Sequence, residues 1–257
     1  MSATGRLQFL GQVGCLLESG SQRLIIDPYL SNSVAEQFGV GLKRQVPPPF
    51  TRASCPHIDF LLLTHAHLDH TDPATLAPLL ESQPHIQIFA PFESRELLRS
   101  IGCDLAEAPP ASWTQLAANL SICAVPAAHT EIHRNSEGEL RDVGYLLKLG
   151  ETTLYHAGDT IPHPEIFAAL KGEVIDIALL PVNERNHYRD AQGIIGNMTL
   201  REAFQMAADF GVKTLIPTHW DMFTPNSVFP EEIELLHKLL APPFKLKILQ
   251  AGQTISL

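Results

Sequence analysis

The feature that most constrains this chain is a cluster of metal-binding residue types directly after a short apolar segment. Over residues 60–70 the chain runs Phe-Leu-Leu-Leu and then Thr-His-Ala-His-Leu-Asp-His, the first part typical of a strand buried on both faces. In extended backbone, residues i and i+2 point the same way, so His65 and His67 can converge on one ion. Asp69 and His70 follow where the chain turns, and can face a second ion. The spacing therefore predicts a two-metal site at the end of a buried strand.

Three more candidate ligands, His129, Asp159 and His219, each follow a predicted strand. Open sheets place their sites at strand ends, where loops can vary without disturbing the core. These three therefore complete two sets of ligands. One ion is expected to bind His65, His67 and His129, the other Asp69, His70 and His219, with Asp159 bridging them. Asp69 is also expected to orient the nucleophile and to shuttle its proton, which makes Asp69 and Asp159 the predicted catalytic carboxylates.

Short strands and helices alternate along the rest of the chain. Strands are predicted at residues 7–10, 13–18, 23–26, 60–63, 86–89, 121–125, 143–149, 152–156, 175–180, 213–216, 245–249 and 254–256. Helices are predicted after Asp72-Pro73, at 92–101, at 199–210 and near 231–240. Residues 39–56, which include three consecutive prolines, are expected to form a surface loop. This order predicts the α/β class, as an αββα sandwich of two mixed β-sheets flanked by helices, in a single domain over residues 1–257.

Composition narrows the functional classes. The 257 residues carry 18 Lys and Arg against 28 Asp and Glu, a net charge of −10, so nucleic acid is an unlikely partner. No apolar run approaches the roughly 18 residues that cross a bilayer, and the first residues lack the pattern of a signal peptide. The four cysteines include no CxxC pair, which indicates reduced thiols. We therefore expect a cytoplasmic protein with no membrane partner.

These motifs occur in the order typical of the metallo-β-lactamase superfamily, which the chain resembles over nearly its whole length. The resemblance rests on the HxHxDH motif at residues 65–70, His129, the Gly-Asp-Thr of residues 158–160, and His219. More narrowly, residues 10–14, 27–31, 196–199 and 217–222 resemble the branch that includes ascorbate-6-phosphate lactonase. The resemblance implies that Asp27 supports the metal loop rather than binding metal. It also implies Mn²⁺ or Zn²⁺ and a homo-oligomer.

The ligand set indicates the chemistry of the site. Imidazole and carboxylate ligands without thiolate suit Zn²⁺, Mn²⁺ or Fe²⁺. A water held between two such ions loses its proton near neutral pH and becomes a hydroxide nucleophile. Two divalent cations outweigh two carboxylates, so the site favours a small anionic substrate. The leading hypothesis is hydrolysis of a lactone or ester of a sugar-like, phosphorylated molecule; the alternatives are a metal-dependent phosphodiesterase and a non-catalytic metal-binding sensor.

Two groups of residues are predicted to surround the metals. The loop after the strand at 175–180 offers polar and cationic side chains for substrate binding, namely Asn183, Arg185, Tyr188 and Arg189. Arg185 is the first choice as an anchor for an anion; the alternative is a solvated loop whose arginines pair with Glu184 and Asp190. Side chains next to the ligands can support them through hydrogen bonds, and these are Thr64, Thr218 and Asp221 together with Asp27.

Overall fold

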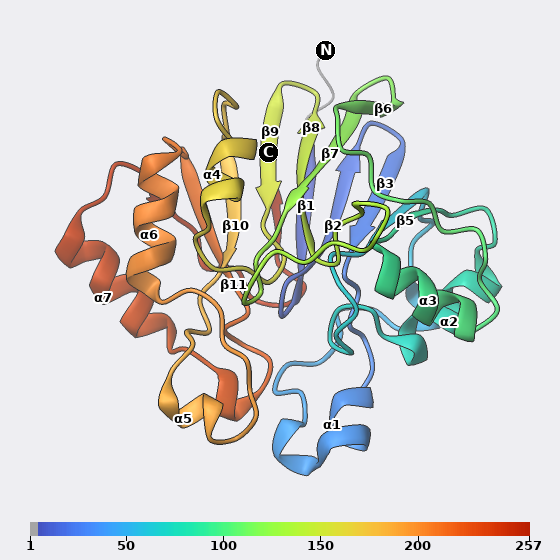
Figure 1. Ribbon diagram of the computed structural model, residues 1–257, viewed down its shortest axis with the longest axis horizontal. Helices are drawn as coiled ribbons and strands as arrows, with labels where there is room; N and C mark the ends of the chain where they lie inside the picture. The colour runs from blue at the N-terminus through green and yellow to red at the C-terminus, as the bar shows by residue number, and fades with distance from the viewer. Residues whose placement is uncertain (1–4) are drawn as a thin grey trace.

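The computed structural model describes residues 5–257 and places two β-sheets face to face, with helices on both outer surfaces (Figure 1). This is the αββα sandwich that the order of elements predicts, and the expectation of two mixed sheets is confirmed. None of the described helices combines the length and the apolar character needed to cross a membrane.

The first sheet has the strand order β13-β1-β2-β3-β4-β5. Antiparallel pairs join β13, β1, β2 and β3, and parallel pairs join β3, β4 and β5, so the sheet is mixed. Its strands are β1 (Arg6–Gly11), β2 (Gly14–Ser19), β3 (Gln22–Ile26), β4 (Phe60–Leu62), β5 (Gln87–Phe89) and β13 (Thr254–Ser256).

The second sheet has the order β12-β11-β10-β9-β8-β7-β6. Here β9 to β12 are parallel, and β6 to β9 are antiparallel. Its strands are β6 (Thr114–Ala117), β7 (Leu120–Pro126), β8 (Val143–Leu149), β9 (Thr152–His156), β10 (Ile177–Pro181), β11 (Thr214–Thr218) and β12 (Lys245–Leu246).

Alternation along the strands divides the apolar side chains between three layers of core. In β4, Leu62 lies in the core between the sheets, whereas its neighbour Leu61 packs outward against α2 and α3. In β10, Leu179 lies between the sheets and Ala178 packs outward with the α6 residue Phe204. The helices are α1 (Ser33–Phe38), α2 (Pro73–Ser82), α3 (Phe92–Ser100), α4 (Pro164–Ala169), α5 (His187–Asp190), α6 (Leu200–Asp209) and α7 (Pro230–Leu240).

Two predicted helix starts form by the capping that the sequence indicates. The Asp72 side chain accepts a hydrogen bond from the N–H of Ala74, and Pro73 begins α2. Thr199 and Glu202 form a reciprocal capping box at the start of α6. The caps therefore fix the residues at which α2 and α6 begin, and with them the direction of the loops that precede these helices.

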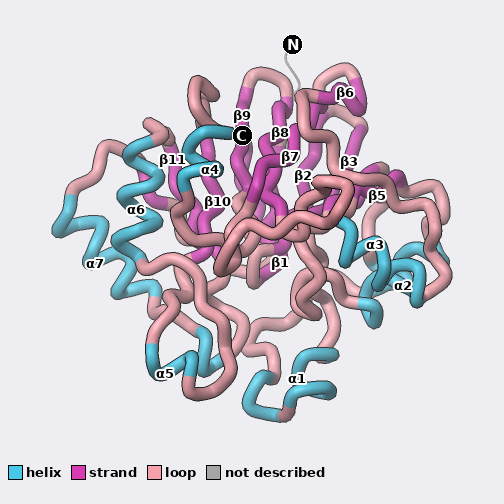
Figure 2. The backbone as a smooth tube through the Cα atoms, viewed as in Figure 1, coloured by secondary structure: helices cyan, strands magenta, loops and turns pink. Residues whose placement is uncertain are grey.

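The differences from the sequence prediction lie in short elements. The strand predicted at 245–249 is only the two residues of β12, and the strand predicted from Val13 begins at Gly14 because residues 12–13 form a turn. The short helices α1, α4 and α5, the edge strand β6 and three turns of 3₁₀ helix (Val40–Leu42, Arg52–Ser54 and Thr224–Asn226) were not predicted. Elements of three to six residues contain too few periods for a hydrophobic pattern to mark them. Both α1 and α5 lie at the same end of the sandwich (Figure 2).

Candidate metal centre

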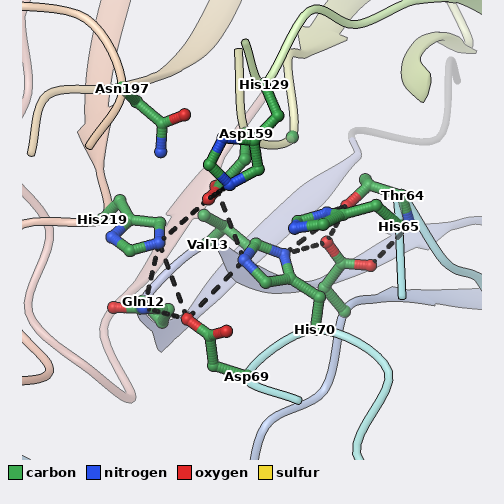
Figure 3. Close-up of polar contacts among 12 residues, drawn as sticks. Gln12, Val13, Thr64, His65, Asp69, His70, His129, Asp159, Asn197 and His219 are labelled. Atoms are coloured by element: carbon green, nitrogen blue, oxygen red, sulfur yellow. Dashed lines mark hydrogen bonds and ion pairs between the residues drawn. The ribbon is translucent and has the colours of Figure 1, made fainter. Parts of the chain in front are cut away.

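All seven predicted ligands lie on loops that leave strands of the two sheets. Residues 65–70 follow β4 of the first sheet, while the second sheet supplies His129 after β7, Asp159 after β9 and His219 after β11. Because β7, β9 and β11 run in the same direction, their ends meet at one edge. Figure 3 shows side chains from both sheets facing one another there.

The first group consists of His65, His67, His129 and Asp159. Each offers one ligand atom, and these four atoms all lie within 4.8 Å of one another. His129 Nε2 lies 3.4 Å from Asp159 Oδ2. Distances of this size fit atoms that share one ion at the usual 2.0–2.2 Å bond length.

The second group consists of Asp69, His70 and His219, whose ligand atoms also lie within 4.8 Å of one another. Asp69 Oδ2 is 3.7 Å from His70 Nε2 and 3.6 Å from His219 Nε2. Asp159 contacts this group as well, with Oδ1 3.4 Å from His70 Nε2 and Oδ2 3.2 Å from His219 Nε2. The Asp159 carboxylate therefore touches both groups, as a bridging ligand would.

Several ligand atoms are buried without a hydrogen-bond partner among the described residues. They are His65 Nε2, His70 Nε2 and Asp159 Oδ1. A buried polar atom without a partner costs about 1–3 kcal/mol, so such atoms need an explanation. Since all three point into the same cluster of nitrogen and oxygen donors, divalent cations such as Zn²⁺ or Mn²⁺ fit the site.

Asp27 supports the ligands from behind. It is fully buried, and its carboxylate accepts hydrogen bonds from Thr64 N at 2.8 Å and from Thr64 Oγ1 at 2.5 Å. Asp27 Oδ2 also lies 2.8 Å from His70 Nδ1. Because a carboxylate only accepts, it keeps a proton of His70 on Nδ1, so that Nε2 is the nitrogen that binds an ion once its own proton is displaced. Thr64 Oγ1 lies 3.0 Å from His65 Nδ1 and extends the same support to a second ligand.

Burial and charge set the protonation of the cluster before any ion binds. Burial, followed by the charges of His70 and His67, holds the pKa of His65 well below its usual range. Burial alone would lower the pKa of His70, but the carboxylates of Asp159 and Asp69 and the hydrogen bond to Asp27 raise it to about 10. Burial alone would raise the pKa of Asp159, but His219 and His70 lower it. In the metal-free protein, His70 is therefore a positively charged imidazolium that lies among ionised carboxylates, at the position where a metal ion would supply the positive charge.

The loop that carries Asp159 depends on Gly158, which has φ +62°. A Cβ at this position would lie 2.9 Å from the Cβ of Thr64 and 3.0 Å from the Val143 carbonyl oxygen. Only glycine allows both the left-handed backbone and this close approach of the two sheets. The Gly-Asp pair therefore brings the bridging carboxylate against the loop after β4.

Sequence reasoning missed Gln12, which enters the site from the turn between β1 and β2. Its side chain is buried, and Nε2 donates to Asp69 Oδ2 at 2.5 Å and lies 3.1 Å from His219 Nε2. The backbone at Gln12 and His219 has φ 60°, and at Asp27 φ 42°, all in the left-handed region. Two signals in the sequence mark Gln12, its position between Gly11 and Gly14 and its place in the stretch 10–14 of the narrower resemblance, but neither gives a reason to expect a polar contact with Asp69.

The other predicted supporting residues lie near His219. Asp221 is buried, and its Oδ1 accepts a hydrogen bond from Gln12 N at 2.8 Å. Burial raises the pKa of Asp221 to about 6. Thr218 is also buried, and its carbonyl oxygen accepts a hydrogen bond from Val182 N at 3.0 Å, next to the first residues of the loop after β10.

The residues predicted to bind substrate are placed differently from the ligands. Arg185 forms two hydrogen bonds with the Glu202 carboxylate, at 2.9 and 2.5 Å, and a third with Asn197 O. Arg189 is buried and donates to the carbonyl oxygens of Glu184 and Ser227. Both guanidinium groups therefore have partners within the protein: Arg185 has the Glu202 carboxylate, and Arg189 has two carbonyl oxygens and Glu184 Oε1, which lies 3.8 Å from its Nη1. Their contact with substrate stays a prediction.

Arg185 lines a hollow that it shares with His129, whereas the remaining two residues of this group line none of the hollows next to His129. Tyr188 is 64 % exposed on α5. Asn183 is buried and donates from Nδ2 to Asn226 Oδ1 at 3.1 Å, while its own Oδ1 accepts from Asn197. Asn226 in turn lies 3.5 Å from His219 Nδ1, so Asn183 reaches the metal ligands through one intervening side chain.

A cavity of about 210 Å³ opens over the two ligand groups. The polar part of its lining consists of His67, Asp69, His129, Asp159, His219 and Asn226. The rest is apolar apart from Gly193, and comes from Val34, Phe38, Leu42, Leu68, Ile194, Ile195 and Phe223. A concave apolar pocket with a few convergent polar groups is the usual form of a small-molecule site.

The chain is similar in sequence and in fold to known proteins described as metal-dependent hydrolases. Residues 22–220 match the family described as the beta-lactamase superfamily domain. A UPF0173 metal-dependent hydrolase of Pyrococcus furiosus is 30 % identical over 266 residues, which cover 98 % of this chain and 99 % of the relative. Another, of Caldivirga maquilingensis, is 25 % identical over 98 % of both chains. The solved structure of Igni18, a metallo hydrolase from Ignicoccus hospitalis, covers 99 % of this chain and 98 % of its own with a TM-score of 0.74 at 19 % identity.

A two-sheet sandwich with a His and Asp cluster at this edge defines a metal-dependent hydrolase of the metallo-β-lactamase superfamily. Within that superfamily, the chain belongs to the UPF0173 family of metal-dependent hydrolases.

Proposed function

We propose that this protein hydrolyses a lactone or ester bond of a small molecule at a centre of two divalent ions, Zn²⁺ or Mn²⁺. The observation that carries the proposal is the position of Asp159, whose carboxylate contacts His129 of one ligand group and His70 and His219 of the other. The narrower resemblance to ascorbate-6-phosphate lactonase supports a lactone. The cytoplasmic location, the single domain and the homo-oligomer stay predictions from the sequence.

When bound, two such ions lower the pKa of a coordinated water and withdraw electrons from a carbonyl oxygen. His65, His67 and His129 would hold one ion, and Asp69, His70 and His219 the other. The depressed pKa values of His65 and His67 keep these imidazoles neutral and ready to bind. Asp27 and Thr64 keep His70 and His65 in fixed orientations, so the ligands need little rearrangement.

Asp69 is placed to move the proton of the reaction. It lines the cavity, and Gln12 holds its Oδ2 by a hydrogen bond. In hydrolysis, the water oxygen bonds to the carbonyl carbon, the bond between that carbon and the leaving oxygen breaks, and one proton passes from the water to the leaving oxygen. A partly exposed carboxylate next to both oxygens can accept this proton and return it.

The proposal is tested with protein loaded with Zn²⁺ or with Mn²⁺ and given two panels of substrates, lactones and esters in one and chromogenic phosphodiesters in the other. We expect turnover of the first panel and its loss in Asp159→Asn. Asp176→Asn is the matched control, because Asp176 accepts the N–H of Thr153 at 2.8 Å at the opposite end of β9. Turnover of phosphodiesters alone would overturn the proposal in favour of a phosphodiesterase, and metal binding without any turnover would indicate a sensor.

A further inference from the structure

We propose that the apolar lining of the metal cavity binds an uncharged, apolar chain on the substrate, so that the enzyme prefers esters and lactones with a medium-length alkyl group over phosphorylated ones. This inference rests on the proposed hydrolase function and names the class of substrate for it. It is an alternative to the anionic, phosphorylated substrate predicted from the sequence, and the experiment below separates the two.

Two segments distant in sequence form the apolar walls. Val34, Phe38 and Leu42 come from α1 and the turn of 3₁₀ helix after it, and Ile194 and Ile195 come from the loop after α5. Figure 1 shows α1 and α5 at the end of the sandwich where the ligand loops gather. The cavity is continuous with the metal ligands because the same space touches His67, Asp69, His129 and His219.

The mouth of the cavity exposes large apolar side chains. Phe38 is 63 % exposed and Ile195 is 50 % exposed, while Val34 and Phe223 in the same lining are buried. Ile195 also lines two neighbouring hollows that share His129, of about 380 and 230 Å³. Apolar side chains that gather at the mouth of a reactive site mark a binding surface, and an alkyl chain that reaches from the metals to Ile195 would cover them.

No lysine or arginine is part of the described lining of this cavity. Two arginines line the neighbouring hollows that share His129, and both are paired: Arg185 with Glu202, and Arg141 with Asp142 at 2.9 Å. Arg189 donates to two carbonyl oxygens, and Arg44 donates to those of Tyr29, Ser31 and Val46. A phosphate remote from the reacting bond would therefore lose water without gaining a cation. An alkyl chain would bind favourably in the same surroundings, because the apolar lining removes it from water.

The test measures kcat/KM of the metal-loaded enzyme on 4-nitrophenyl acetate, butyrate and hexanoate. Each buried methylene should raise kcat/KM about three- to fourfold. Binding is measured separately, by calorimetry with acetohydroxamate and hexanohydroxamate, and the longer one should bind more tightly by a similar factor per methylene. 6-Phosphogluconolactone, an anionic lactone, is compared with δ-decalactone and should be the poorer substrate.

Ile195→Ser should lower the ratio of hexanoate to acetate kcat/KM at least about fivefold, because it removes apolar surface from the mouth. Val174→Ser is the matched control, since Val174 is 69 % exposed and does not line the cavity, and it should keep the wild-type ratio. A flat dependence on chain length, or a preference for the phosphorylated lactone, would refute this inference while leaving the hydrolase function intact. Absence of turnover on every ester and lactone would instead refute the proposed function.

Discussion

Replacement of Asp27 by Asn tests whether the buried carboxylate controls the metal ligands. The carboxylate accepts three hydrogen bonds, from Thr64 N, Thr64 Oγ1 and His70 Nδ1. Asparagine keeps the shape but turns one acceptor oxygen into an N–H donor. If that donor faces His70, the imidazole must move its proton from Nδ1 to Nε2, the nitrogen that faces the ion. If the amide turns over, the donor meets the N–H of Thr64.

Either orientation of the amide loses one hydrogen bond to a charged acceptor. Such a bond contributes about 1.5–3 kcal/mol, so the free energy of unfolding of the metal-free protein should fall by about that amount. Partners that orient metal ligands typically contribute 10- to 100-fold in metal affinity, so the ion at Asp69, His70 and His219 should bind about that much more weakly.

The assay is competition for Zn²⁺ with a chromogenic chelator, combined with urea unfolding of metal-free protein. Asp59→Asn is the matched control, because Asp59 also accepts a backbone N–H, that of Arg23 at 2.7 Å, but precedes β4 at the end away from the ligands. We expect normal affinity for both ions in the control. If Asp27→Asn retained wild-type affinity for both ions, the reasoning that Asp27 fixes the tautomer of His70 would be refuted.

Three further predictions concern charge in the centre. Asp159→Asn should weaken binding of both ions and abolish hydrolysis with an unchanged circular dichroism spectrum; retention of one tightly bound ion would show that Asp159 does not bridge. Zn²⁺ binding to metal-free protein near pH 7 should release at least one proton, because the raised pKa of His70 keeps it protonated until the ion displaces the proton; calorimetry in buffers of different ionisation enthalpy measures this, and zero release would contradict it. Asp221→Asn should stabilise the metal-free protein at pH 8 by about 3 kcal/mol and leave it unchanged near pH 3, because burial raises the pKa of Asp221 to about 6, so its ionisation costs stability as pH rises from about 4 to 6; equal urea midpoints at pH 8 would exclude this cost.

The architecture and the meeting of the ligands could be predicted from the sequence because both depend on local patterns. Apolar segments such as 60–63 mark buried strands, and ligands that follow several such strands share an edge when the strands run the same way. For this reason the second sheet brings His129, Asp159 and His219 to one edge, where His65 of the first sheet meets them. Their metal-binding roles remain predictions that the experiments above test.

The surroundings of the metals could not be predicted, because they depend on which partner a side chain selects. Arg185 pairs with Glu202, a residue that the sequence already assigns to the capping box of α6. Nothing in the loop sequence shows that one carboxylate serves both roles. The sequence predicts a surface loop at 39–56, but it does not predict that Leu42 within this loop forms part of the cavity wall. Contacts between segments 150 residues or more apart leave no periodic signal.

The left-handed backbone at Gln12, Asp27 and His219 has a consequence for how this enzyme can change over generations. Each such conformation costs about 1–3 kcal/mol, so the three together form a local store of conformational strain. Selection for thermal stability alone would favour glycine at these positions. Glycine would also remove the side chains that hold the metal centre, and turnover would fall. Heat-resistant variants that stay active should therefore carry their changes in the outer helices, far from this edge.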